Sequence, residues 1–125
     1  MKRMMCAVAA VSVMGCMQMN ESQAQTPPLG PPEATLAAMR ADAAMRASVT
    51  VADVHIESTQ SVTWRDASLG CPQPGMMYAQ ILVPGWRVVI AAGGKRLDYH
   101  VGRRGNWLRC PADRVQEPLP GNPAV

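Results

Sequence analysis

Apolar residues recur with helical spacing in the stretch that follows a proline-rich segment. Leu36, Met39 and Ala43 stand at positions i, i+3 and i+7, which places them on one face of a helix. The stretch contains neither glycine nor proline, and Pro32 directly before it suits a first helical position. The pattern therefore predicts one amphipathic helix over residues 33–47.

Beyond residue 48 the apolar positions follow the spacing of β-strands. Valine-rich residues 49–64 predict a strand or a bulged strand pair. Further strands are predicted at 78–83, 86–92, 96–101 and 107–110. Pro84-Gly85 indicates a turn or a bulge, and Gly93-Gly94 indicates a hairpin. Connections this short require antiparallel pairing.

These elements predict an α+β domain, in which one N-terminal helix packs on a four- to five-stranded antiparallel meander. The helix has to cover one face of the sheet, because neither element can bury its apolar side alone. We expect residues 33–112 to form this domain. Four prolines predict an extended linker over residues 25–32, and further prolines predict an irregular tail over residues 113–125.

The first 24 residues have the order of a secretory signal segment, with a short basic start, an apolar run and a polar end. The apolar run, residues 6–17, is about 12 residues long, whereas a membrane-spanning helix needs about 20. Cleavage after Ala24 would release the protein, whereas Val-Met-Gly-Cys at 13–16 resembles a lipobox and makes Cys16 a lipidation candidate. Either route predicts export to the periplasm, free or lipid-anchored to the outer membrane.

The cysteines are divided between the signal segment and the domain. Two of the four cysteines lie in the signal segment, which leaves Cys71 and Cys110 for the domain. In an oxidising compartment such a pair is expected to form a disulfide, which would stabilise the fold by about 4 kcal/mol. Two buried free thiols are the alternative. Neither cysteine has a CxxC partner, so we expect no metal, no cofactor and no redox-active pair.

Between the predicted strands lies a glycine- and proline-rich loop, residues 65–77. A loop that is anchored by a disulfide loses little entropy on binding, which suits a recognition loop. The alternative is that it only closes the end of the sheet. If it binds a partner, Leu69 and Met76 should be exposed. The candidate binding residues are Trp64, Asp66, Leu69, Gly70, Pro72, Met76 and Tyr78.

Basic residues concentrate after residue 86, although the formal net charge of the chain is only +3. They form a solvated face or a site for an anionic partner, such as phospholipid headgroups, lipopolysaccharide or an acidic protein surface. With this modest charge and predicted export, we expect no nucleic-acid binding. The candidate basic face consists of Arg87, Lys95, Arg96, Arg103, Arg104 and Arg109.

Motifs of enzymes are sparse. The chain has no phosphate-binding loop, no HExxH and no GxSxG, and its two histidines are His55 and His100. We expect His55 to be exposed and His100 to be structural or solvent-facing. Asp66, at the start of the loop, is expected to accept backbone N–H groups in an Asx-turn. An enzymatic alternative pairs His100 with Asp66 as acid and base, and requires the two side chains to be in contact.

A motif over residues 64–110 resembles that of a family of small exported bacterial proteins. The pattern W-x-D-x-S-L-G-C-P begins at Trp64, Y-x-Q at Tyr78 and P-G-W at Pro84, and Y-H begins at Tyr99, with a last cysteine at Cys110. The resemblance implies export and the disulfide, but no activity. The order of a helix and a meander is also similar to PepSY-type and cystatin-like modules, which are mostly peptidase-associated or inhibitory.

These observations predict a non-enzymatic binding module of the cell envelope. We expect a monomer whose partner is an unknown envelope protein or peptide, held by the loop and the adjoining sheet edge, as in a peptidase inhibitor. One alternative is a binder of anionic envelope components through the basic strands. The other is a small hydrolase-type enzyme. In each case a lipid at Cys16 is a candidate membrane attachment.

Overall fold

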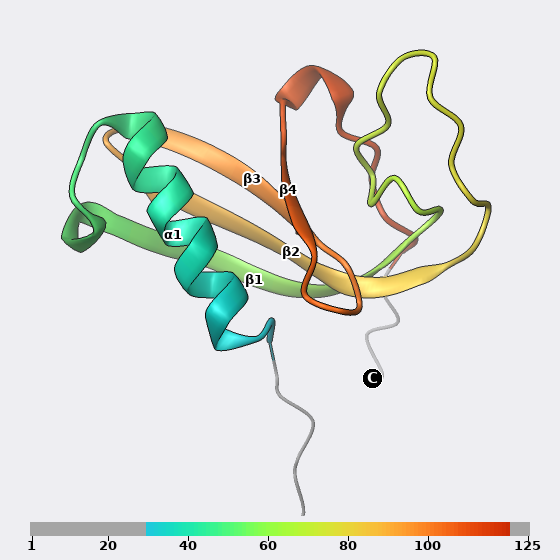
Figure 1. Ribbon diagram of the computed structural model, residues 1–125, viewed down its shortest axis with the longest axis horizontal. Helices are drawn as coiled ribbons and strands as arrows, with labels where there is room; N and C mark the ends of the chain where they lie inside the picture. The colour runs from blue at the N-terminus through green and yellow to red at the C-terminus, as the bar shows by residue number, and fades with distance from the viewer. Residues whose placement is uncertain (1–29, 121–125) are drawn as a thin grey trace, which may run out of the picture.

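The helix α1 spans Glu33–Ala47 and lies across one face of a four-stranded antiparallel sheet (Figure 1). This computed structural model describes residues 30–120. The predicted helix and the predicted α+β class are confirmed. Pro32 is the residue before the helix rather than its first residue, and Ser48 ends the helix in a left-handed conformation, with φ 57°. The signal segment, Cys16 and linker residues 25–29 lie outside the described residues.

The sheet has the strand order β1-β2-β3-β4, so that each strand pairs with its neighbours in the chain. The strands are β1 (Val54–Trp64), β2 (Val83–Ala92), β3 (Lys95–Val101) and β4 (Trp107–Cys110). A bulge interrupts β1 between Ile56 and Ser58.

Three strand predictions need correction. Residues 51–53 form a 3-10 turn, so the bulged strand predicted over 49–64 begins only at Val54. Residues 78–82 belong to the loop, because β2 starts at Val83. Pro84-Gly85 lies inside β2 rather than in a turn. Proline is tolerated near the beginning of a strand, where the missing N–H breaks few sheet hydrogen bonds.

The main core lies between α1 and the sheet. Met39 and Ala43 on the helix pack against Val88, Ile90 and Val101 on the strands, and all five are fully buried. Two polar contacts fix the helix in place.

The hydroxyl of Tyr99 donates to the Asp42 carboxylate at 2.7 Å, and the Thr35 hydroxyl donates to the Gly105 carbonyl at 2.9 Å. Because Tyr99 faces the helix, its neighbour His100 faces the other side of the sheet.

The described part of the predicted tail packs on the domain. After the 3-10 turn Ala112–Arg114, residues 115–120 have no regular secondary structure, but their backbone is hydrogen-bonded. The Gln116 amide donates to the Gly70 carbonyl at 2.9 Å, and the Leu119 amide donates to the Thr63 carbonyl at 3.0 Å. The C-terminal segment, as we call residues 115–120, therefore holds the base of the loop against the end of β1.

Candidate functional site

A second, smaller core surrounds Trp64 on the sheet face that α1 leaves open. Trp64 and His100 are both fully buried, and their rings stack with centroids 4.4 Å apart and an interplanar angle of 22°. The Trp64 indole N–H donates to the Val101 carbonyl at 3.0 Å. Leu69, which is 4% exposed, closes this core from the loop side.

Two glycines are required by the position of the Trp64 ring. A Cβ at Gly85 would lie 2.0 Å from the Val101 carbonyl oxygen and 3.1 Å from Trp64 Nε1. A Cβ at Gly70 would lie 2.6 Å from the Trp64 ring and 2.6 Å from the Gln116 carbonyl oxygen. The glycines of the Gly-Cys-Pro and Pro-Gly-Trp motifs thus allow the indole to be buried.

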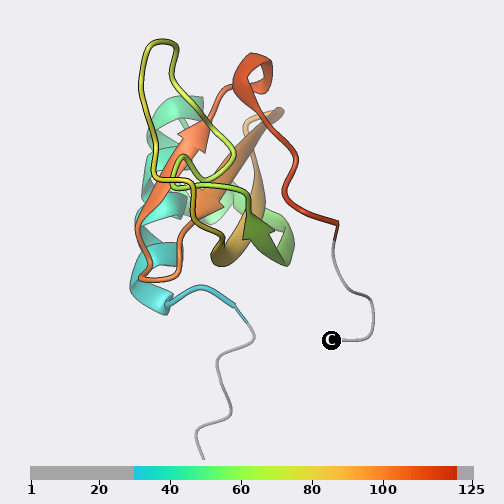
Figure 2. The same cartoon turned by 90° about the vertical axis from the view of Figure 1, so that its right-hand side faces the viewer.

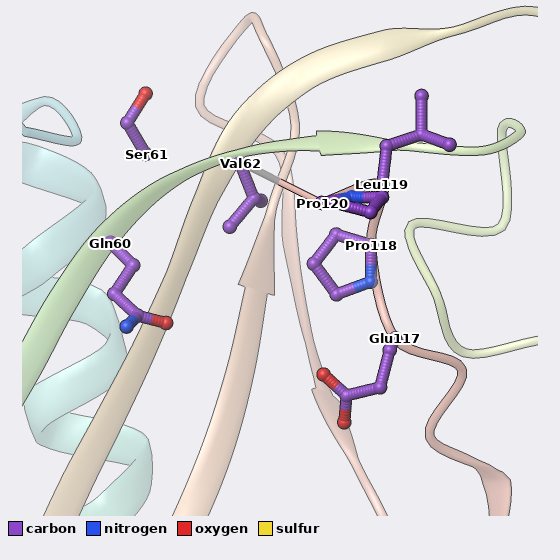
Figure 3. A pocket seen from close by; sticks show the side chains of 7 residues that line it. All are labelled: Gln60, Ser61, Val62, Glu117, Pro118, Leu119 and Pro120. Carbon is purple, nitrogen blue, oxygen red and sulfur yellow. The ribbon is translucent and has the colours of Figure 1, made fainter. Parts of the chain in front are cut away.

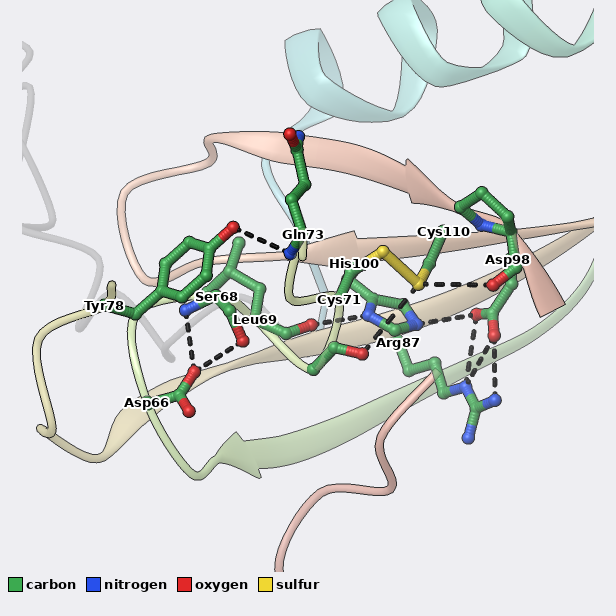
Figure 4. The surroundings of a disulfide bond; sticks show 12 residues. Asp66, Ser68, Leu69, Cys71, Gln73, Tyr78, Arg87, Asp98, His100 and Cys110 are labelled. Atoms are coloured by element: carbon green, nitrogen blue, oxygen red, sulfur yellow. Dashed lines mark hydrogen bonds and ion pairs between the residues drawn. A yellow bond between two sulfur atoms is a disulfide. The ribbon is translucent and has the colours of Figure 1, made fainter. Parts of the chain in front are cut away.

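The first part of the loop is fixed by its own side chains (Figure 4). Asp66 accepts from the Ser68 amide at 2.8 Å and from the Ser68 hydroxyl, which confirms the expected Asx-turn. Further along, the Tyr78 hydroxyl accepts from the Gln73 amide at 2.9 Å. The disulfide Cys71–Cys110 is present, with both cysteines buried and their Cα atoms 5.7 Å apart. It ties the loop to the last residue of β4.

A chain of charged groups joins the loop to the C-terminal segment. His100 Nδ1 contacts the Leu69 carbonyl oxygen, and this nitrogen carries a proton because a carbonyl can only accept. On the other side of the ring, His100 Nε2 lies 3.2 Å from Asp98 Oδ1 without a well-aligned hydrogen bond. The Arg87 guanidinium binds both oxygens of Asp98, at 2.8–3.2 Å, and also Glu117 at 2.9 Å.

These contacts set the charge state of Asp98. Burial raises the pKa of this carboxyl, but the close approach of His100 and the hydrogen bonds and positive charge of Arg87 outweigh burial and lower the pKa to about 2. Asp98 is therefore ionised at neutral pH. It anchors Arg87 and, through His100, the backbone of Leu69.

The enzymatic alternative is wrong in its choice of residues. His100 is fully buried, and its ion-pair partner is Asp98, whereas Asp66 bonds to Ser68. The two side chains are therefore not an acid–base pair. His55 is exposed on β1, as expected. In the part of the chain that the structure describes, no three His, Cys, Asp or Glu side chains are grouped as metal ligands.

The expected binding loop is divided between buried and exposed residues. Leu69 was expected to be exposed and is buried, because it packs on the Trp64 core; Trp64 and Gly70 are buried as well. Asp66, Pro72 and Tyr78 are partly exposed. Met76 is 59% exposed, as expected. Most of the candidate residues therefore shape the loop rather than present a contact surface.

The exposed apolar side chains lie further along, in residues 76–82, which we call the apolar segment. Met77 is 96% exposed, Ile81 is 59% exposed and Leu82 is 62% exposed. The signal for them was two adjacent apolar pairs, Met76-Met77 and Ile81-Leu82, in a loop rich in glycine and proline. Figures 1 and 2 show this loop extending beyond the sheet where β1 ends and β2 begins.

The basic residues do not form the contiguous face that was considered. Arg87 and Arg96 point away from α1. Arg87 forms ion pairs with Asp98 and Glu117, and Arg96 forms one with Glu57. Lys95 and Arg109 belong to the helix side, since Lys95 pairs across β2 with buried Ala92 and Arg109 pairs across β3 with buried Tyr99. Alternation along the strands separates the two groups.

Arg103 and Arg104 stand apart from both groups. They lie in the turn between β3 and β4, and both are exposed. Neither forms an ion pair with a described residue.

Two hollows adjoin the loop and its neighbours. One, of about 230 Å³, lies between the start of β2 and the turn from β3 to β4; it is lined by Ile81, Leu82, Val83, Pro84, Arg103, Arg104 and Asn106. The other, of about 470 Å³, lies between β1 and the C-terminal segment (Figure 3); it is lined by Gln60, Ser61, Val62, Glu117, Pro118, Leu119 and Pro120. Its one charged group, Glu117, is already paired with Arg87. The first hollow combines apolar side chains with two exposed arginines that form no ion pair with a described residue.

No helix among residues 30–120 is long and apolar enough to cross a membrane. Residues 36–110 match a family described as a domain of unknown function (DUF8738). No curated protein and no solved structure matches the chain.

Proposed function

Because the chain belongs to the DUF8738 family, a domain of unknown function, we infer its function from the site itself. We propose that the protein is a non-enzymatic module of the cell envelope that docks on a membrane surface through the apolar segment. The single observation that carries this proposal is the exposure of four large apolar side chains within seven residues: Met76, Met77, Ile81 and Leu82.

Exposed apolar side chains of this size are unfavourable in water unless something covers them. Contiguous apolar patches on soluble proteins mark interaction sites. Burying one such side chain contributes about 1.5–3 kcal/mol, so partial insertion of several of them supports reversible membrane association. Arg103 and Arg104, beside Ile81 and Leu82, add the positive charge that an anionic bilayer attracts.

The rigidity of the loop supports a binding role. The disulfide, the Asx-turn at Asp66 and the contact of His100 with the Leu69 carbonyl restrain the path that leads to the apolar segment. A segment held in this way loses little conformational entropy when it docks. The predicted export, whether free or anchored at Cys16, would bring the domain to the membranes of the envelope.

The non-enzymatic part of the proposal rests on how the reactive side chains are used. Cys71 is in the disulfide, His100 is buried between Leu69 and Asp98, and Asp66 caps the loop. Each therefore has a structural role. A protein or peptide partner for the loop is the competing interpretation, and the experiment below distinguishes it from a membrane.

The test is sedimentation of the purified exported protein with phosphatidylcholine and phosphatidylglycerol vesicles. We compare the wild type with Met77→Asp/Leu82→Asp and with the control Val51→Asp. Val51 is 53% exposed and lies in the 3-10 turn directly before β1, whereas the apolar segment follows the end of β1. The wild type and the control should sediment with vesicles, whereas the double variant should stay in the supernatant.

Absence of wild-type binding to both kinds of vesicle would refute the membrane proposal. A defined envelope protein that binds the wild type, and not the double variant, would then establish the protein-partner interpretation in its place. Equal binding of the wild type and the double variant would show that the apolar segment is not the contact surface.

A further inference from the structure

The groove between the start of β2 and the turn from β3 to β4 has two chemically different walls. Ile81, Leu82, Val83 and Pro84 form an apolar wall, and Arg103, Arg104 and Asn106 form a polar one. We propose that this groove binds the phosphate group of an anionic phospholipid. The inference rests on the proposed membrane docking and adds a site and a lipid class to it.

The two arginines are free to bind an anion. The guanidinium groups of Arg46, Arg87 and Arg96 are all neutralised by carboxylates at 2.8–2.9 Å. In contrast, neither Arg103 nor Arg104 has a carboxylate within 4 Å among the described residues. Guanidinium groups match phosphate oxygens in paired hydrogen bonds, which makes arginine the side chain best suited to this ligand.

The turn that carries the arginines is well defined. The Gly102 amide donates to the Asn106 carbonyl at 2.7 Å, and the Gly105 amide donates to the Gly102 carbonyl at 3.1 Å. The Thr35 hydroxyl on α1 donates to the Gly105 carbonyl at 2.9 Å, so the turn is also fixed to the helix. Both arginines therefore extend from a backbone that is already in place beside the apolar wall.

The size of the groove indicates which part of a lipid it holds. Its volume is about 230 Å³, whereas sites for drug-sized molecules occupy about 300–1,000 Å³. A headgroup phosphate fits this space and a whole phospholipid does not. The acyl chains would stay in the bilayer, where the exposed side chains of Ile81 and Leu82 meet them.

The experiment compares phosphatidylglycerol with phosphatidylcholine vesicles, using Arg103→Gln/Arg104→Gln and the control Arg96→Gln. Arg96 is also exposed, but it lies on β3 and pairs with Glu57. We expect the double variant to bind phosphatidylglycerol vesicles roughly 30-fold more weakly, since each cation near an anionic surface contributes about a factor of five. Its binding to phosphatidylcholine vesicles, through the apolar segment, should not change. The control should bind both kinds of vesicle like the wild type.

A conservative variant, Arg103→Lys/Arg104→Lys, separates a phosphate site from general charge attraction. Loss of affinity for phosphatidylglycerol vesicles in this variant supports the groove, because lysine keeps the charge without the paired donors. If the lysine variant binds phosphatidylglycerol vesicles as tightly as the wild type, the proposed phosphate site in the groove is overturned. Inorganic phosphate that binds the protein in the absence of vesicles, and binds it more tightly than phosphatidylglycerol vesicles do, would make free phosphate the ligand and overturn the lipid assignment.

The failure of this inference can be told from failure of the proposed function. A wild type that binds both kinds of vesicle equally well refutes the preference for an anionic phospholipid, and with it this inference, and leaves membrane docking intact. A wild type that binds neither refutes both.

Discussion

The ring of Trp64 lies against the ring of His100, 4.4 Å between centroids, and both side chains are fully buried on the sheet face that α1 does not cover. Trp64 comes from the end of β1, and His100 comes from β3, two strands away. The loop packs on this pair through Leu69. The position of the apolar segment therefore depends on a small core that is separate from the one beneath the helix.

Replacing Trp64 with phenylalanine should destabilise the protein by about 1–3 kcal/mol. The change keeps an aromatic ring but leaves the Val101 carbonyl without the indole donor that it accepts from at 3.0 Å. Urea unfolding followed by far-UV circular dichroism measures the difference. Trp107→Phe is the matched control. Because Trp107 is partly exposed, this variant should lose less free energy of unfolding than Trp64→Phe. Equal losses in the two variants would contradict the role assigned to the Trp64 hydrogen bond.

Replacing Gly85 with alanine should prevent normal folding. The added Cβ would lie 2.0 Å from the Val101 carbonyl oxygen, which is backbone and cannot move aside. Gly94→Ala is the control, since a Cβ at Gly94 meets nothing within 4 Å and adds only the strain of φ 78°. That strain costs about 1–3 kcal/mol. Soluble yield and thermal unfolding report the difference, and a Gly85→Ala protein as stable as Gly94→Ala would contradict the prediction.

Removing the disulfide with Cys71→Ala/Cys110→Ala should lower the free energy of unfolding by up to about 4 kcal/mol. The bond joins two residues that are 39 positions apart in the sequence, and closing so long a loop restricts the unfolded chain. The loop should also exchange its amide hydrogens faster, whereas the amides of α1 should change little. Urea unfolding and hydrogen exchange by mass spectrometry provide the two measurements. Unchanged exchange in residues 66–80 would show that the other contacts suffice to hold the loop.

The stability contributed by Asp98 should disappear in acid. The pKa of this carboxyl falls from 3.8 to about 2 on folding, so ionisation favours the folded state. The contribution is complete above about pH 4 and is lost as the pH falls from about 4 to 2. The groups that face Asp98 are His100 and Arg87, and Glu117 in turn faces Arg87.

Asp98→Asn is the variant for this measurement. The stability difference between wild type and variant should be largest at neutral pH and should shrink below pH 4. Glu57→Gln, at an exposed pair with Arg96, is the control and should show a much smaller pH-dependent difference. If the wild type is still more stable than Asp98→Asn by the same free energy at pH 2, the stabilising role assigned to ionised Asp98 is contradicted.

Tyr99 should resist ionisation as long as the protein is folded. Burial, and then the hydrogen bond to ionised Asp42, raise the pKa of Tyr99 above its ordinary value of 10.0. The folded state therefore loses stability once the pH exceeds about 10, where the unfolded chain ionises. An alkaline titration at 295 nm should show a late phase that coincides with unfolding and is absent in Tyr99→Phe. A late phase that precedes unfolding would disprove the link.

Sequence reasoning succeeded where one physical preference dominated. The spacing of Leu36, Met39 and Ala43 predicted α1, and the two domain cysteines predicted the disulfide. It failed at residues 78–82, which were interpreted as part of a strand over 78–83. There the loop contacts, such as the Gln73 amide donating to the Tyr78 hydroxyl, hold the chain outside the sheet.

The candidate site was predicted only in part, because the sequence does not show which of its residues are buried. Motif residues stood out because they are unusual, yet Leu69 and Gly70 are buried to accommodate Trp64. The exposed side chains of Met77 and Leu82 look in the sequence like ordinary core residues. The separation of the basic residues depended on strand register, which decides the face on which each side chain lies.

The contacts that complete the loop come from residues 110–119. Cys71 forms its disulfide with Cys110. The carbonyls of Gly70 and Thr63 accept hydrogen bonds from the amides of Gln116 and Leu119. Because a polypeptide is synthesised from its N-terminus, the loop cannot be closed until residues 110–119 have emerged as well. The apolar segment is then assembled last, so the surface that we propose to meet a membrane does not exist in its final form on the nascent chain.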